Sequence, residues 1–196
     1  MASSAPTRIV ALQPDDWIRS AQARVAGHGV ESVRVEVLAR DLGVSKGSFY
    51  WHFRDRSELL ETLLARWEDA ELEWLNAGDK AGTATRWAKF IERTSDPGRI
   101  RIEVALRAWA RADEKVAGRV AAIEKRKARL IADVLRDVGF TETAADSGSE
   151  VVLLISLGWL DRATRDSQVP ISGSSLSELL SDFILAASAR SPASDR

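Results

Sequence analysis

Residues 33–60 read VRVEVLARDLGVSKGSFYWHFRDRSELL, and this stretch decides the fold. Apolar residues recur at i, i+3, i+4 and i+7, which is one face of a short helix, at Val35, Leu38, Ala39 and Leu42. Gly43 follows directly, where a helix ends and the backbone adopts a positive φ. Ser45 is a favourable N-cap for a second helix over about 45–52. The pattern therefore predicts a helix-turn-helix.

The second helix carries two kinds of side chain. Phe49 and Phe53 stand four residues apart on one face, so we assign both to the core. The remaining positions are small, basic or hydroxyl-bearing, and they are Ser45, Lys46, Gly47, Ser48, Tyr50 and His52. They begin at a helix N-terminus, whose dipole favours phosphate. Gly47 allows a close backbone approach, and Ser48 can donate to a base edge or a phosphate. We expect this side to lie in a DNA groove.

The segment GVSKGSFYWHFRDRSELL resembles the signature of the TetR family of bacterial transcriptional regulators. The resemblance spans about residues 14–64, and IRIEVALRAWARAD at 100–113 is reminiscent of one branch of that family. It implies an all-α fold, with an N-terminal helix-turn-helix DNA-binding domain and a C-terminal helical ligand-binding and dimerisation domain. It also implies that Tyr50 and His52 contact phosphates and that Lys46 contacts a base or a phosphate.

Two residues depart from the family pattern. Val25 stands where a larger aromatic packing residue is usual, and Arg34 stands where Thr or Ser usually caps the first helix of the motif. Arg34 is therefore expected to reach a phosphate in place of capping. Arg56 begins the next helix, where a cation opposes the dipole at a cost of roughly a few tenths of a kcal/mol. A phosphate partner would explain its position.

Composition excludes several classes of site. The chain has no Cys, and its two His residues, His28 and His52, fall in different segments. Disulfides, thiolate metal sites and a His-based metal cage are therefore not expected. No nucleophile–base pair or Gly-rich phosphate loop appears. We predict no catalytic residue, no metal, no cofactor and no enzyme activity.

The net charge of −1 does not by itself indicate a nucleic-acid binder. The prediction rests on basic residues that cluster around the motif, among them Arg34, Lys46, Arg54 and Arg56. The longest apolar run, residues 151–160, is too short to cross a bilayer. The segment MASSAPTR lacks the apolar core of a signal peptide. We expect a cytoplasmic protein with no membrane partner.

The helical pattern continues along the whole chain and predicts about nine helices. Residues 10–60 form the predicted DNA-binding domain and residues 61–190 the C-terminal domain. Asp55 and Glu58 make a capping-box pair for a helix over 56–76, about 30 Å long at ~1.5 Å per residue. Further helices are expected near 83–94, 97–112, 113–138, 142–166 and 176–189. The helix over 56–76 joins the two domains, so we expect it to transmit movement from one domain to the other.

The C-terminal part holds a group of aromatic residues on three predicted helices: Trp87, Phe90, Trp109 and Trp159. The family resemblance implies a small-molecule cavity there, and these rings would line it. The alternative is that they only fill core. No basic cluster is evident among these apolar positions, so a flat aromatic or hydrophobic effector fits better than a sugar or nucleotide.

The last two predicted helices are expected to pair two copies of the chain. The region around residues 151–160 is apolar nearly all round, which a monomer of this size would struggle to bury. The expected interface residues are Val151, Leu154, Ile155, Leu157, Leu179, Leu180 and Phe183. The charged run from Glu124 to Arg129 could form a second nucleic-acid patch, but it is more typical of the solvated face of a helix.

These patterns predict a homodimeric, ligand-responsive regulator of transcription. The leading hypothesis is a repressor that leaves a palindromic operator when a small apolar or aromatic effector binds, although the residues do not separate a repressor from an activator. The alternative is a helical interaction module that keeps the N-terminal helix-turn-helix domain but has lost DNA binding. The near-zero net charge keeps this possibility open.

Overall fold

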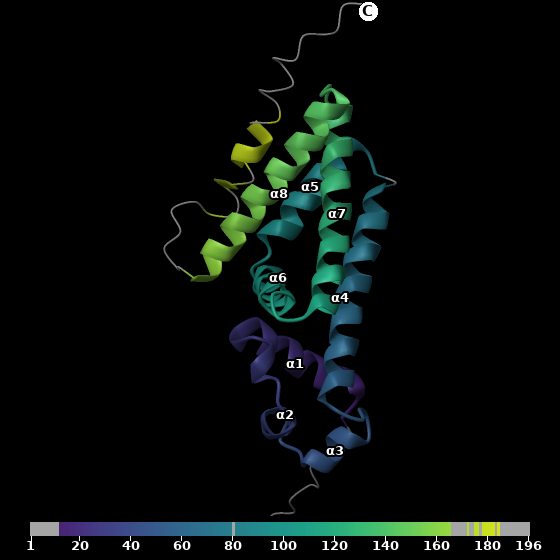
Figure 1. Ribbon diagram of the computed structural model, residues 1–196, viewed down its shortest axis with the longest axis vertical. Coiled ribbons are helices and arrows are strands. Elements are labelled where there is room, and N and C mark those ends of the chain that lie inside the picture. The colour runs from purple at the N-terminus through teal and green to yellow at the C-terminus, as the bar shows by residue number, and fades with distance from the viewer. Residues whose placement is uncertain are drawn as a thin grey trace, which may run out of the picture. The chain divides into compact units, whose positions relative to one another are not determined.

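The computed structural model describes residues 12–79, 81–165, 172, 175–176, 178–182 and 184. Every regular element within these residues is a helix and none is a strand, so the predicted all-α class is confirmed. The helices group into two compact units that divide after Leu64 (Figure 1). A search of the described helices finds no segment with the length and apolarity to traverse a lipid bilayer.

The N-terminal unit contains α1 (Pro14–His28), the 3-10 helix η1 (Val30–Ser32), α2 (Val35–Asp41), α3 (Lys46–Tyr50) and the start of α4 (Arg56–Asp79). Pro14 occupies the first turn of α1, where its missing N–H costs nothing. Gly29 ends that helix with a φ of 77°. The buried face of α1 presents Trp17, Ile18, Ala21 and Val25 to the unit's core.

The C-terminal unit contains the rest of α4, α5 (Thr83–Ser95), α6 (Pro97–Ala110), α7 (Glu114–Asp137) and α8 (Glu142–Arg165). The described residues between 175 and 184 are helical as well. In this unit α7 runs alongside α4 and α8 and also packs on α5 and α6 (Figure 1). Asp96 caps α6 by accepting the backbone N–H of Arg99 at 2.8 Å, and Asp113 caps α7.

The centre of this unit holds a cluster of buried charges that the sequence did not predict. The expectation that residues 124–129 form a solvated face is wrong at Lys127, whose exposed fraction is only 4%. Its ammonium lies 3.0 Å from Oε2 of Glu71 and 2.7 Å from Oε1 of Glu103. Lys127 can be buried because its ammonium is paired with these two carboxylates. Burial of an unpaired cation would cost too much free energy. Lys125 and Arg129 are exposed, as predicted.

Glu71, itself 1% exposed, ties four helices together. Its Oε1 accepts hydrogen bonds from Arg93 of α5 at 2.5 and 3.1 Å and from Arg99 of α6 at 3.1 Å. Lys127 supplies the link from α4 to α7. We call Glu71, Arg93, Arg99, Glu103, Arg107 and Lys127 the buried charge cluster.

Glu103 completes the cluster between Lys127 and Arg107. Burial alone would raise the pKa of Glu103, but the charges of Lys127 and Arg107 outweigh it, so that the pKa lies below its ordinary value of 4.5. A carboxyl with a lowered folded-state pKa contributes stability that is fully present above the ordinary pKa. That contribution is lost as the pH falls below 4.5 towards the lowered value.

We predict that Glu71→Ala lowers the free energy of unfolding by about 3–5 kcal/mol, because it leaves Arg93 and Lys127 short of a carboxylate in a buried place. Thermal and urea denaturation followed by circular dichroism measure the change. The matched control is Glu92→Ala, on the exposed face of α5, which should change stability by about 0.5 kcal/mol or less. Equal losses for the two variants would contradict a structural role for Glu71.

Candidate DNA-binding surface

The orientation of α3 is set by the burial of Phe49. This ring is fully buried and meets Trp17 of α1 edge-on, with 5.3 Å between the ring centroids. Phe53, also buried, lies 5.5 Å from Phe49. Because one face of α3 is held inward by these contacts, the opposite face, with Lys46 and Tyr50 one turn apart, is directed to solvent.

The turn between α2 and α3 has the geometry that the sequence predicted. Gly43 adopts a φ of 68°. The backbone N–H of Gly43 bonds to the carbonyl of Arg40 at 3.2 Å, and that of Val44 bonds to the carbonyl of Ala39 at 2.9 Å. These two bonds form a Schellman motif, which closes α2 and redirects the chain into α3.

The helix caps agree with the prediction in position but only partly in chemistry. Ser45 is the N-cap of α3, but its hydroxyl makes no capping hydrogen bond. Arg34 precedes α2 with an extended backbone and, as expected, does not cap it. Asp55 accepts the N–H of Glu58 at 2.9 Å, and Glu58 accepts the N–H of Arg54 at 2.7 Å, one residue earlier than in a standard capping box.

The predicted contact residues are mostly accessible. Arg34, Ser45, Lys46, Gly47 and Tyr50 are exposed, whereas Ser48, His52 and Arg56 are partly buried. The α3 helix is shorter than the predicted 45–52, because the chain leaves the helix at Trp51 and forms a tight turn in which the N–H of His52 bonds to Phe49. Contact with DNA stays a prediction for all eight residues.

Lys46 has a partner in the free protein that the sequence analysis missed. Its Nζ donates to Oε1 of Glu36 on α2 at 3.1 Å, and both side chains are well exposed. A backbone hydrogen bond at Glu36 and the ammonium of Lys46 together lower the pKa of the Glu36 carboxyl. Spacing along the chain does not reveal this pair, since it forms across the turn between two helices.

Arg56 has a structural role in the free protein. Its Nε donates to the carbonyl of Val33 at 2.6 Å and its Nη2 to the carbonyl of Val30 at 2.7 Å. These bonds fasten the start of α4 to η1 and to the entry of α2. They explain why a cation is kept at a helix N-terminus, so a phosphate contact is no longer needed to account for Arg56.

Trp51 is a second residue that the sequence analysis passed over. With 87% of its surface exposed, it is the most accessible of the large hydrophobic side chains in the described residues. Tyr50 beside it is 60% exposed. Tyr50 and Trp51 therefore place two accessible aromatic rings at the C-terminal end of α3. The signal was available, since position 51 lies nearly opposite Phe49 on a helix.

The four aromatic residues proposed for the ligand pocket do not form one described cluster. Trp87 and Phe90 stack on α5 with 5.5 Å between centroids, Phe90 is buried, and Trp87 donates from Nε1 to Oγ of Ser181 at 2.7 Å. Phe90 belongs to the core of this unit, and the partly buried Trp87 packs against that core. Trp109 on α6 and Trp159 on α8 are partly buried. A cavity between the rings stays a prediction.

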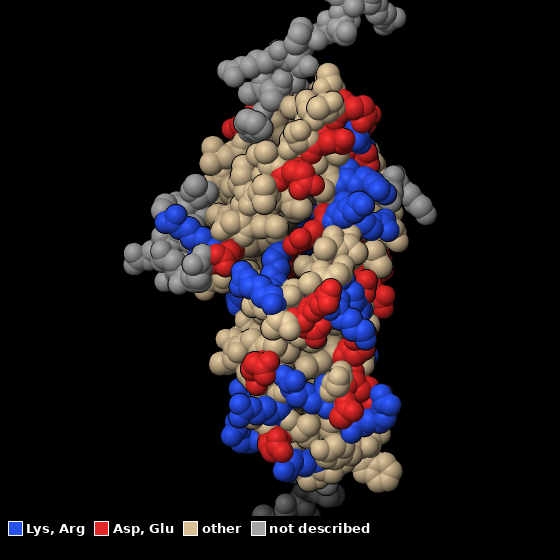
Figure 2. Space-filling view, in the orientation of Figure 1, with Lys and Arg blue, Asp and Glu red and all other residues tan. Residues whose placement is uncertain are grey.

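The residues proposed for dimerisation are divided by the fold. Val151, Leu154, Ile155 and Leu179 are exposed, Leu157 is partly buried, and Leu180 lies in the core. Phe183 lies outside the described side chains. Figure 2 shows an area without charged side chains over α8, whereas acidic and basic groups are interspersed elsewhere on this face. The exposed members are the candidates for an interface.

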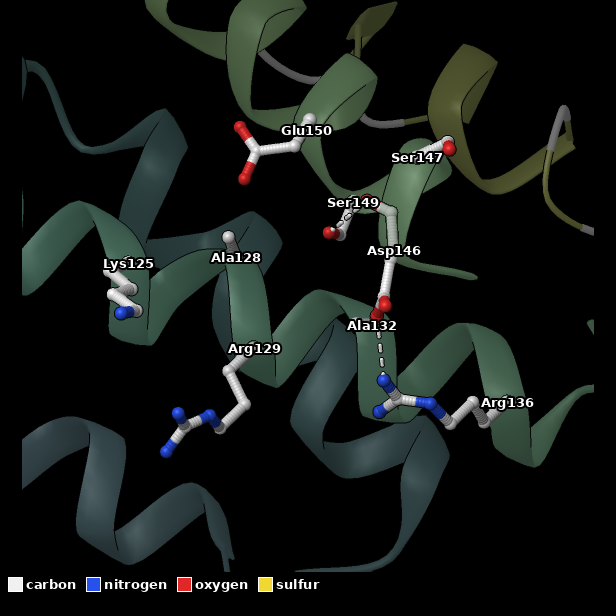
Figure 3. A pocket seen from close by; sticks show the side chains of 9 residues that line it. All are labelled: Lys125, Ala128, Arg129, Ala132, Arg136, Asp146, Ser147, Ser149 and Glu150. Atoms are coloured by element: carbon white, nitrogen blue, oxygen red, sulfur yellow. Dashed lines mark hydrogen bonds and ion pairs between the residues drawn. The ribbon is translucent and has the colours of Figure 1, made fainter. Parts of the chain in front are cut away.

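A cavity of about 540 Å³ lies between α7 and α8 (Figure 3). Lys125, Arg129 and Arg136 come from α7, and Asp146 and Glu150 come from α8. Arg136 bonds to Asp146 at 2.7 Å, which links α7 and α8 at the cavity (Figure 3). Opposite charges therefore stand on opposite walls. Among the described residues no group of His, Asp or Glu side chains has the arrangement of a metal site.

Comparison with known proteins agrees with this geometry. Residues 18–63 match the family model described as bacterial regulatory proteins, tetR family. The chain is 40% identical over 52 residues to the class A tetracycline repressor protein from transposon 1721 of Escherichia coli. That match covers 26% of this chain and only 24% of the repressor.

Solved structures extend the likeness of fold to most of the chain. A transcriptional regulator from Rhodococcus sp. has a TM-score of 0.70 and 19% identity, with 90% of this chain and 95% of that one covered. A transcriptional regulator from Saccharomonospora viridis, solved in complex with choline, has a TM-score of 0.73 and 18% identity, with 87% and 94% covered. The N-terminal unit therefore resembles the DNA-binding part of the tetR family of bacterial regulatory proteins, and the fold of most of the chain resembles that of solved transcriptional regulators.

Proposed function

We propose that this protein is a homodimeric transcriptional regulator that binds operator DNA through α3 and acts as a repressor released by a small molecule. The observation that carries the proposal is the outward face of α3, where Lys46, Gly47 and Tyr50 are exposed because Phe49 is buried. The match of residues 18–63 to the tetR family model supports it. Such a protein acts where the operator is, in the cytoplasm.

DNA binding in this scheme exchanges one partner of Lys46 for another. The ammonium leaves the Glu36 carboxylate, 3.1 Å away, for a phosphate or a base edge. Water screens an exposed ion pair strongly, so a phosphate can compete with it. Gly47 lets the backbone of α3 come close to the groove, and the hydroxyl of Tyr50 and the indole of Trp51 extend the contact.

We predict that Lys46→Ala and Tyr50→Phe each weaken binding to an operator selected from genomic fragments by about tenfold, since each removes a hydrogen bond to a charged group. Loss of the Lys46 phosphate contact should also lower the slope of log K against log salt by about one unit. Gel-shift titrations over a range of salt measure both. Lys125→Ala, the same change in the C-terminal unit, should leave affinity and slope unchanged.

The same titration decides between regulator and interaction module. An interaction module that has lost DNA binding would show no salt-dependent affinity for any genomic fragment. If Lys46→Ala and Tyr50→Phe bind DNA as tightly as the parent protein, α3 is not the element that contacts DNA, although the protein still binds it.

We also propose that two copies pair through α8 and the following helical residues. Val151, Leu154 and Ile155 expose apolar surface on α8, and Leu179 adds to it. Two-fold pairing brings the same patch of each copy together and requires a roughly palindromic operator. The two recognition helices then lie about 34 Å apart, or a multiple of it.

We predict that Leu154→Glu converts the dimer to a monomer, because the 66% exposed side chain would place a carboxylate in an apolar interface. Light scattering at micromolar concentration gives the mass. Ala121→Glu, a change of the same kind on the exposed face of α7, should keep the mass of a dimer. A monomeric mass for the parent protein would contradict the proposal outright.

The proposed effector is a small apolar or aromatic molecule that binds near Trp87, Phe90, Trp109 and Trp159. The structure of similar fold with bound choline supports a small-molecule site in this type of fold. Trp109 and Trp159 are partly buried, so part of each side chain remains accessible to solvent. The effector must favour one state by about 1.4 kcal/mol for each tenfold loss of DNA affinity.

We predict that members of a library of apolar aromatic compounds quench Trp fluorescence and that Trp109→Ala loses this response while it keeps DNA binding. Trp51→Phe, which removes an exposed indole from the N-terminal unit, should keep the quenching of Trp fluorescence by these compounds. Reciprocity requires operator DNA to weaken effector binding by the same factor by which the effector weakens DNA binding. An unchanged response in Trp109→Ala would remove this residue from the site.

A further inference from the structure

A second cavity, of about 320 Å³, opens on the C-terminal unit where α4, α5 and the start of α6 meet. It is lined by Trp74, Lys89, Glu92, Arg93, Asp96 and Arg99. Its volume is at the lower end of the roughly 300–1,000 Å³ of typical ligand pockets, so it suits a small molecule. Three of its six side chains are cations, and they come from two helices.

The charges of the lining are not balanced within the cavity. Lys89 is partly buried, and no ion pair between described residues involves it. Asp96 is already engaged, since its Oδ1 accepts the backbone N–H of Arg99 at 2.8 Å as the cap of α6. Glu92 is exposed. The lining therefore carries three cations and two carboxylates, and Glu71 behind it pairs with both arginines but not with Lys89.

Arg93 and Arg99 are both held by hydrogen bonds to the buried carboxylate of Glu71. Arg93 donates to Glu71 and to the carbonyl of Ala70 at 3.1 Å, and its guanidinium lies 4.9 Å from the centroid of the Trp74 ring. Arg99 donates to the same carboxylate oxygen, and 39% of its side chain remains exposed. Guanidinium groups fixed in this way are preorganised to bind a further anion, because little side-chain entropy remains to be lost.

We propose that this cavity binds a small anion, a carboxylate or a phosphate, held by Lys89 and Arg99 beside the fixed charge of Arg93. The site is separate from the aromatic residues proposed above for the effector. Glu92 weakens the site, because its carboxylate stands among the lining groups and repels the same ligand.

The site has a direct connection to α4. Oε1 of Glu71 depends for its hydrogen bonds on Arg93 and Arg99, the arginines that line the cavity. An anion that draws Arg99 towards itself competes with Glu71 and changes the link of α4 to α5 and α6. The proposed DNA-contact residues of α3 lie shortly before α4, so we extend the proposal to a change in DNA affinity on anion binding; this last step rests on the proposed function, but anion binding does not.

The test is a titration of the full-length protein without DNA, at constant ionic strength, with inorganic phosphate in one series and benzoate in the other. Trp fluorescence and calorimetry follow binding. We expect saturable binding of at least one probe. Lys89→Ala and Arg99→Gln should each weaken it about threefold to tenfold, as for partly exposed charge contacts. Glu92→Gln should strengthen it, and Trp74→Phe should remove the fluorescence change.

Lys125→Ala, which removes a cation that lines the α7–α8 cavity, is the matched control and should leave binding unchanged. Binding of phosphate alone or of benzoate alone identifies the anion class, and both outcomes support the site. The absence of saturable binding by either probe overturns the proposal. So does binding that Lys89→Ala, Arg99→Gln and Glu92→Gln leave unaltered. Gel shifts on the same variants report separately on DNA binding.

Discussion

The packing of Phe49 against Trp17 is the contact on which the N-terminal unit depends. Phe49 is fully buried, and α3 is only five residues long, so one ring fixes the rotation of the whole helix. Rotation by one residue would turn Tyr50 inward and Phe49 into water. The α3 residues proposed to contact DNA therefore owe their direction to a hydrophobic contact on the opposite side of the helix, and the Schellman turn at Gly43 sets the direction from which α3 begins.

The features that sequence analysis predicted well are those that a single element encodes. The apolar spacing from Val35 to Leu42, the glycine at 43 and the proline at 14 each act over a few residues, and the helices begin and end within a few residues of the predicted bounds. Phe49 and Phe53 were assigned to the core for the same reason: a helix of known period has only one inward face.

The features that sequence analysis missed depend on partners from other elements. Lys127 stands in a charged run that is typical of a solvated face, and only Glu71 and Glu103, more than twenty residues away, make its burial possible. Arg56 finds carbonyls at positions 30 and 33, and Lys46 finds Glu36 across a turn. Side-chain polarity indicates that a charge needs a partner but not which residue supplies it.

The buried charge cluster gives α4 a property that an apolar core would not provide. Apolar contacts weaken gradually as helices slide, whereas a buried carboxylate that loses one of its cations is left strongly unfavourable. Glu71 therefore favours discrete arrangements of α4 against α5, α6 and α7, each with its charges satisfied. The same helix begins at Arg56, in the N-terminal unit. Arg56, bonded to Val30 and Val33, fastens that N-terminal end to the unit that carries α3. Glu71 and Arg56 therefore belong to one continuous helix, which begins in the unit that also holds α3.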